Sequence, residues 1–142
     1  MIELSKLEDH LKTIQADQWR KVFELLPEIK QSEYLGEIEF DDQKNDIKQL
    51  PYWKNSEIVN KFIDTVYNLN IIPAFDWTNW EEGKLILKNS KQDLEQFDQV
   101  TLCKLLTVII RTDRFCDGFL NTNFENNTIP KILESLKNKT KV

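Results

Sequence analysis

Apolar side chains recur three or four residues apart in several stretches of the chain, which is the spacing of one face of an α-helix. The clearest groups lie at 4–14, 19–26, 58–69 and 129–136. Residues that favour helix N-termini stand at or just before the start of most of the expected helices. These candidate N-caps are Asp17, Asn55 or Ser56, Asp76, Asp98 and Thr128.

The stretch from 98 to about 112 differs from the other helical stretches because it is apolar on nearly all sides. A helix of this kind is normally buried at the centre of a protein. We therefore predict one mainly α-helical domain over 1–142, a bundle of six or seven helices around the helix near 98–112. We expect the polar tail 137–142 to fray.

Between residues 30 and 54 the helical period is lost, and Pro27 predicts a break in the helix before this region. The segment YLGEIEF alternates weakly between apolar and polar residues, which predicts a short extended element near 34–40. The aromatic segment LPYW, 50–53, is expected to be a docked loop. Gly83 interrupts an expected helix, so we expect a close packing contact there.

Composition limits the class of protein. Hydrophobic residues make up 40% of the chain and charged residues 30%, as in ordinary globular proteins. Three glycines and four prolines are too few for an all-β protein rich in tight turns. The apolar runs are too short to span a membrane, and the first residues do not form a signal peptide. We expect a soluble, cytoplasmic protein.

The net charge of −5 is concentrated in the N-terminal half of the chain. Residues 1–71 hold 14 acidic and 9 basic side chains, whereas residues 72–142 hold 10 of each. The segment 33–46 alone carries six acids against Lys44. Nucleic acid is therefore not an expected partner, because phosphate binding needs a basic face. A protein partner would most plausibly meet the acidic segment 33–46 or the aromatic loop 50–53.

Opposite charges gather directly after the central helix, in RTDRFCDGFL, 111–120. One interpretation is a structural network in which arginines and aspartates pair and clamp the C-terminal helices. In that case Arg114→Ala would leave a buried carboxylate unpaired and cost about 3–5 kcal/mol. The other interpretation is a pocket for a phosphate or carboxylate with an indole wall. Its candidate ligand-binding residues are Trp77, Trp80, Arg111, Asp113, Arg114 and Asp117.

Catalytic and metal chemistry have little support in the sequence. His10 is the only histidine, and no HExxH, EF-hand loop or phosphate-binding glycine loop occurs. Cys103 and Cys116 form neither a CxxC pair nor a disulfide framework, so we expect two reduced thiols. We predict no metal site, no cofactor and no catalytic residue, although a magnesium site of Asp76, Asp113 and Asp117 is an alternative.

Three segments resemble an uncharacterised bacterial family, a domain of unknown function. They are FDWTNWEEG (75–83), TVIIRTDRFCDGFL (107–120) and FENNTIPKILESL (124–136). The resemblance covers roughly 75–136 through the motifs W-x-x-G and R-x-D-R-F-C-D-G. It implies signature positions at Trp80, Gly83, Arg111, Asp113, Arg114, Phe115 and Gly118, and it implies no activity.

Together these features predict a non-enzymatic binding or protein-interaction module of unknown role. The alternative is a protein that binds a small-molecule or nucleotide-type anion at the Trp/Arg/Asp cluster, and this alternative includes an enzyme. The two differ in geometry. The first expects every guanidinium of the cluster to be paired with protein acceptors, and the second expects one to face an open cavity beside an indole.

Overall fold

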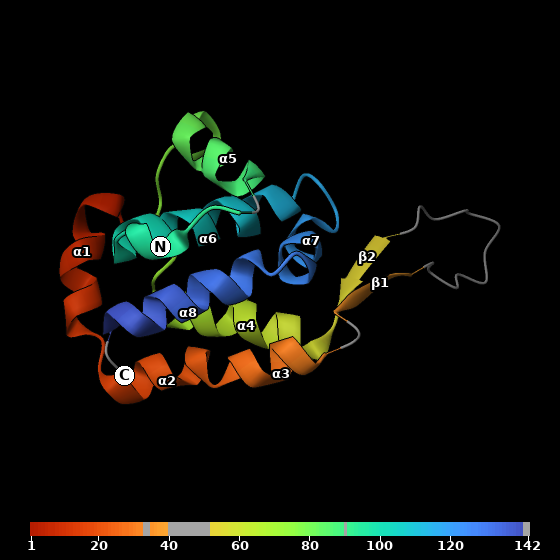
Figure 1. Ribbon diagram of the computed structural model, residues 1–142, viewed down its shortest axis with the longest axis horizontal. Coiled ribbons are helices and arrows are strands. Elements are labelled where there is room, and N and C mark those ends of the chain that lie inside the picture. Colours follow the sequence, from red (N-terminus) through yellow and green to blue (C-terminus); the bar gives the residue numbers. More distant parts are fainter. Residues whose placement is uncertain (33–34, 40–51, 90, 141–142) are drawn as a thin grey trace.

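The computed structural model describes residues 1–32, 35–39, 52–89 and 91–140 (Figure 1). It is mainly α-helical, as predicted. The helices are α1 (Leu4–Thr13), α2 (Ala16–Phe23), α3 (Leu25–Gln31), α4 (Glu57–Asn68), α5 (Glu81–Lys88), α6 (Gln99–Asp113), α7 (Phe119–Glu125) and α8 (Thr128–Thr140). Short 3₁₀ turns lie at η1 (Trp77–Asn79) and η2 (Leu94–Gln96), and the strands are β1 (Gly36–Glu39) and β2 (Tyr52–Asn55). Among the described residues, none of the helices has the length and apolar character needed to cross a membrane.

The helices stack in successive levels (Figure 1). The α2–α3 pair forms one side of the molecule, α4 and α8 lie against it, and α6 packs on α8 from the other side. Helix α5 packs on the far side of α6, α1 lies at one end of the stack, and α7 connects α6 to α8. Helix α6 is therefore central, as its sequence predicted. Its side chains Leu102, Leu105, Leu106 and Ile109 are completely buried.

The start of α6 is fixed by an N-cap that the sequence also predicted. The Asp98 carboxylate accepts a hydrogen bond of 2.8 Å from the backbone N–H of Thr101. Hydrogen bonds from Thr101 hold the pKa of Asp98 below its ordinary value, because they stabilise the charged form. The central helix thus begins at a capped, charged residue and then enters the core.

The break expected at Pro27 falls three residues earlier, at Glu24 between α2 and α3. A proline ring clashes with the carbonyl four residues before it, and that residue is Phe23, where α2 ends. Pro27 itself lies in the first turn of α3, where proline is tolerated. If α2 and α3 are taken as one broken helix, the described residues contain seven helices. The expected Asp17 cap is corrected, since α2 begins at Ala16 and Gln15 is the N-cap.

The extended element predicted near 34–40 is present as β1. It pairs antiparallel with β2 in a two-stranded sheet, with Gly36 opposite Asn55 and Glu39 opposite Tyr52. The sequence did not predict β2, which begins inside the expected aromatic loop. Most of 33–46, and 50–51, lie outside the described residues, so the partner surface expected there stays a prediction.

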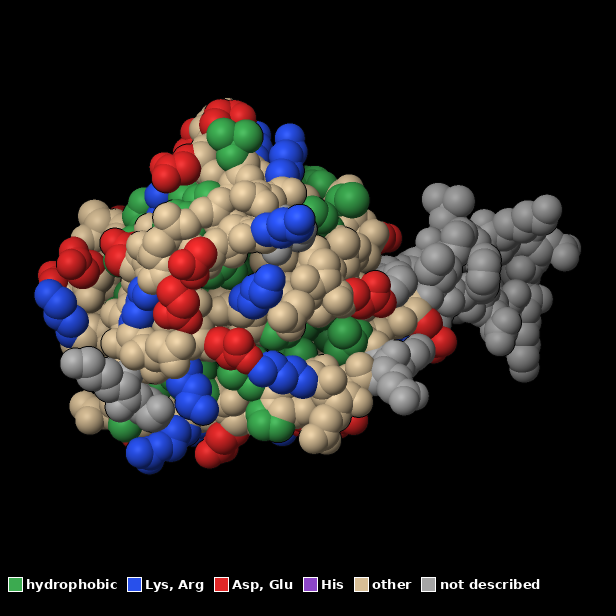
Figure 2. All heavy atoms as spheres, viewed as in Figure 1, with side chains coloured by type: hydrophobic (Ala, Val, Ile, Leu, Met, Phe, Trp, Pro, Cys, Tyr) green, Lys and Arg blue, Asp and Glu red, His purple; other side chains and the backbone are tan. Residues whose placement is uncertain are grey.

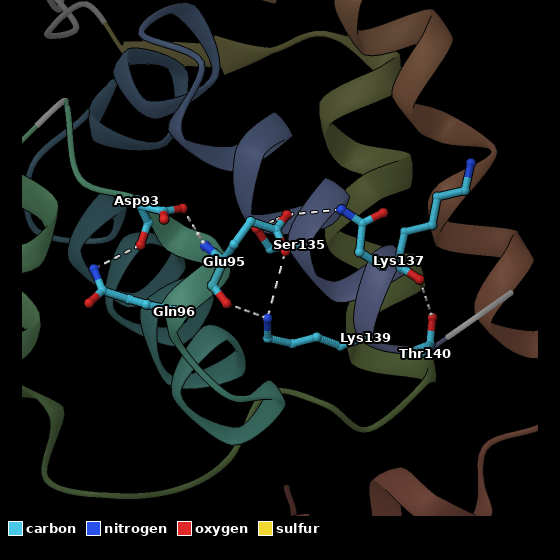
Figure 3. Close-up of polar contacts among 8 residues, drawn as sticks. Asp93, Glu95, Gln96, Ser135, Lys137, Lys139 and Thr140 are labelled. Atoms are coloured by element: carbon cyan, nitrogen blue, oxygen red, sulfur yellow. Dashed lines mark hydrogen bonds and ion pairs between the residues drawn. The ribbon is translucent and has the colours of Figure 1, made fainter.

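Glu95 connects the end of α8 to η2 (Figure 3). Its carboxylate accepts hydrogen bonds of 3.0 Å from Ser135 and 2.9 Å from Asn138. These bonds, Asn138 first, hold the pKa of Glu95 below its ordinary value. The Lys139 ammonium donates to the Glu95 backbone carbonyl at 2.6 Å. The fraying expected of the tail 137–142 concerns motion in solution and stays a prediction. The contacts of Asn138 and Lys139 with Glu95 oppose fraying at this end of α8.

Candidate functional site

The charged turn after α6 positions the next helix. Asp113 is the last residue of α6, and its Oδ1 accepts a 3.0 Å hydrogen bond from the backbone N–H of Leu120 in the first turn of α7. Gly118 precedes α7 with a φ of 86°, a left-handed conformation that glycine adopts without strain. Asp113 therefore fixes the path of the chain from α6 into α7.

The Arg–Asp clamp does not form. Arg114 is the C-cap of α6 and is exposed, and among the described residues no ion pair joins it or Arg111 to Asp113 or Asp117. The half-buried Arg111 instead contacts the Met1 sulfur and lies 6.0 Å from the centre of the Tyr67 ring. The reason is that α6 ends at Asp113, so Asp117 does not share a helical face with it.

Trp80 is the N-cap of α5, and its half-buried ring packs against side chains and backbone around this helix. A Cβ on Gly83 would come within 2.2 Å of the Trp80 ring, so glycine is required for this contact. The Phe75 ring meets the indole edge-on at 5.8 Å, and the Lys104 ammonium lies 4.1 Å from the indole centre. The close contact expected at Gly83 is therefore present, and its partner is the tryptophan three residues earlier. Asp76, expected to cap this helix, precedes η1 instead.

A groove of about 370 Å³ lies between α5, α6 and α7. Its apolar lining consists of Trp77, Leu87, Val108 and Phe119. Its polar lining consists of Lys84, Lys88, Thr112, Thr122, Asn123 and Asn126. Of the six predicted site residues, only Trp77 lines this groove. Its ring lies 6.3 Å from the ring of Phe115, which is 82% exposed.

Each wall of the groove is one face of a helix. Helix α5 contributes residues 84, 87 and 88, α6 contributes 108 and 112, and α7 contributes 119, 122 and 123 together with its C-cap, residue 126. These positions are three or four apart, which is the helical repeat. The sequence analysis did not predict the groove because it identified no helical face between the central helix and the last helix. The three- and four-residue spacing of positions 119, 122, 123 and 126 was the signal that could have predicted this helical face.

The charge of the groove is positive. Among the described residues, two lysines of α5 line it and no aspartate or glutamate does. Lys84 is 3.2 Å from Glu81 in an exposed ion pair. Lys88 makes no hydrogen bond or ion pair with any described residue. Over the face seen in Figure 2, by contrast, Lys and Arg side chains are interspersed with Asp and Glu.

Metal ligands and reactive groups do not gather in the part of the chain that the structure describes. There, no group of three or more His, Cys, Asp or Glu side chains could hold a metal ion. Both cysteines are free. Burial raises the pKa of Cys103 to about 12, which makes it an inert thiol, whereas Cys116 is exposed. The Nε2–H of His10 donates a 2.8 Å hydrogen bond to the Leu69 carbonyl and joins α1 to the end of α4.

Residues 14–141 match DUF6508, a family of unknown function. The chain belongs to this family. The match confirms the resemblance to a domain of unknown function and extends it from the C-terminal half to nearly the whole chain, including α2 and α3. Neither a curated protein nor a solved structure matches the chain. The function of this DUF6508 protein must therefore be argued from its groove.

Proposed function

We propose that this DUF6508 protein is a non-enzymatic binding module and that the groove between α5, α6 and α7 is its binding site. The observation that carries the proposal is the groove itself, a concave site of about 370 Å³ with an apolar floor. Ligand pockets usually occupy about 300–1,000 Å³ and combine apolar walls with a few polar groups. The groove combines apolar residues, Val108 and Trp77 among them, with a small set of lysines and amides.

The chemistry of the lining favours binding over catalysis. It contains no histidine, cysteine, aspartate or glutamate that could serve as a general base or a nucleophile's partner. Its hydroxyl groups belong to Thr112 and Thr122, and that of Thr122 donates to the Gly118 carbonyl at 3.0 Å. We therefore propose that the groove holds its ligand without transforming it.

The test uses octan-1-ol as a neutral apolar probe. We expect it to bind the wild type in a protein NMR titration, with shift changes confined to α5, α6 and α7. Thr122→Trp places an indole at the exposed edge of the groove and should abolish this binding. Lys137→Trp, on an exposed position of α8 outside the groove, is the matched control and should bind as the wild type does. Shift changes spread over the whole surface, or equal binding by both variants, would refute the groove as the site.

A protein partner is the second candidate, and the exposed Phe115 favours it. An aromatic ring that is 82% exposed beside Trp77 at the groove is a typical anchor for a protein interface. Phe115→Ser tests whether this exposed ring belongs to the small-ligand site. A small ligand held between the helices should bind this variant within about twofold of the wild type, since Phe115 does not line the groove. A loss of octan-1-ol binding would place Phe115 in the small-ligand site instead.

The remaining expectations form part of the proposal. We propose a bacterial, cytoplasmic protein that binds neither nucleic acid nor membrane. The mixture of acidic and basic side chains on the face in Figure 2 supports the part of this proposal that concerns nucleic acid. Of the predicted site residues, we assign ligand contact to Trp77. We propose that the other five do not touch the ligand, and that two of them act on the groove indirectly, Trp80 by packing on α5 and Asp113 by positioning α7.

A further inference from the structure

We infer that the ligand of the groove is an apolar molecule with a carboxylate, and that Lys88, with Lys84 beside it, binds this carboxylate. The inference rests on the proposed function and adds the chemical class of the ligand. It starts from a charge imbalance, because the lining formed by the described residues holds two ammonium groups and no carboxylate.

Lys88 is the lysine available to a ligand. It is exposed, and no described residue offers it a hydrogen bond or an ion pair. Lys84 lies on the same face of α5, four residues earlier, but Glu81 already lies 3.2 Å from its ammonium. The pair therefore provides about one uncompensated positive charge at this wall. A singly charged carboxylate matches that charge, whereas a doubly charged phosphate would be only partly neutralised.

The opposite wall sets the orientation of the ligand. Asn123 of α7 is only 3% exposed, and its Nδ2 donates to the Phe119 carbonyl at 2.9 Å. Its Oδ1 accepts no hydrogen bond from a described residue, so a ligand beside Asn123 would meet a free acceptor. A carboxylate beside that oxygen would meet another acceptor, whereas beside Lys88 it meets a donor with positive charge. The anionic end therefore lies on the α5 side.

The floor between the two walls accepts the apolar body. Val108 is 4% exposed at the base, and Leu87 and Phe119 face it from the two walls. Burying hydrocarbon there stabilises the complex at roughly 25 cal/mol per Å² of apolar surface. Apolar contact thus provides affinity, and Lys88 provides the choice of head group.

The experiment compares two probes that share a chain and differ in the head group. Dissociation constants for octanoate and octan-1-ol are measured by NMR titration in the same low-salt buffer. We expect octanoate to bind about tenfold more tightly, as one charge-assisted hydrogen bond at a partly exposed site predicts. The preference should shrink as sodium chloride is added, because salt screens exposed charges.

Lys88→Gln removes the charge and keeps most of the side chain. It should bring the dissociation constants of octanoate and octan-1-ol to within about twofold of each other. Lys21→Gln is the control, since Lys21 is an exposed lysine of α2 that does not line the groove. It should keep the full preference for octanoate.

The possible failures are distinguishable. Equal binding of both probes by the wild type would overturn the carboxylate and leave the binding module intact. An octanoate preference that persists in Lys88→Gln would overturn the role of Lys88. Octyl phosphate binding more tightly than octanoate would overturn the choice of a carboxylate. If neither octanoate nor octan-1-ol binds, the proposed function fails together with the inference.

Discussion

Replacing Gly83 by alanine should destabilise this protein, although the same change stabilises most helices. In an exposed helix, alanine is favoured over glycine by up to about 1 kcal/mol. At Gly83, however, the new Cβ would lie 2.2–2.7 Å from three carbons of the Trp80 ring. The indole must therefore move away from α5.

The magnitude follows from what Trp80 loses when it moves. Overpacking of this kind typically costs about 1–3 kcal/mol. The displaced ring also gives up its edge contact with Phe75 at 5.8 Å and its position 4.1 Å from the Lys104 ammonium. Because Trp80 is only half-buried, it can shift, and we take the loss as about 2 kcal/mol. After the gain in helix propensity, Gly83→Ala should lower the free energy of unfolding by about 1 kcal/mol.

The assay is a double-mutant cycle measured by urea unfolding with circular dichroism at 222 nm. In the Trp80→Ala background the obstacle is gone, so Gly83→Ala should become stabilising by up to about 1 kcal/mol. The coupling between the two positions would then be about 2 kcal/mol. In the wild-type background the melting temperature should fall by roughly 3 °C. If Gly83→Ala stabilises both backgrounds equally, the packing of Trp80 on Gly83 is refuted.

Three further predictions concern single side chains. Asp98→Ala should lower the free energy of unfolding by about 1 kcal/mol at pH 7 through loss of the N-cap. The pKa of Asp98 is lower in the folded state than in the unfolded state. The stabilising contribution of Asp98 is therefore fully present above its unfolded-state pKa and disappears as the pH falls through its folded-state pKa. Urea titrations of the mutant and the wild type should accordingly converge at low pH. Asp113→Ala should cost about 1 kcal/mol and Arg114→Ala less than about 0.5 kcal/mol in the same assay, the reverse of what an ion-pair clamp would give. With a thiol reagent, Cys116 should react in the native protein and Cys103 only on unfolding; fast reaction of two thiols would contradict the burial of Cys103.

Helix faces and the N-cap of the central helix could be predicted from the sequence because they depend on local spacing. The apolar circumference of α6 and the Asp98 cap both appear as patterns of neighbouring residues, and both are present. The position of the α2–α3 break was less accurate, because the proline clash acts on a carbonyl four residues earlier. Strand β2 was missed because pairing with β1 is a contact between distant segments, which no local period of Tyr52–Asn55 reveals.

The site was harder to predict than the fold. The six candidate residues were grouped by chemical type and by closeness in sequence, and this assumed that α6 continues past Asp113. The helix ends there, so Arg114 and Asp117 lie in a turn and only Trp77 reaches the groove. The groove takes its walls from three helices, and its lysines belong to α5. Their common location depends on how α5 and α7 pack on α6.

The charged turn and the groove are nevertheless connected through α7. Asp113 holds the first turn of α7 by its hydrogen bond to the Leu120 N–H, and α7 carries Phe119 and Asn123 into the groove. A change at Asp113 can therefore alter ligand binding by moving a wall that it does not itself form. Arg114 has no such connection, because it is exposed and its side chain makes no hydrogen bond or ion pair with a described residue. The adjacent residues Asp113 and Arg114 thus have different roles, because only the Asp113 carboxylate holds a wall of the groove in place.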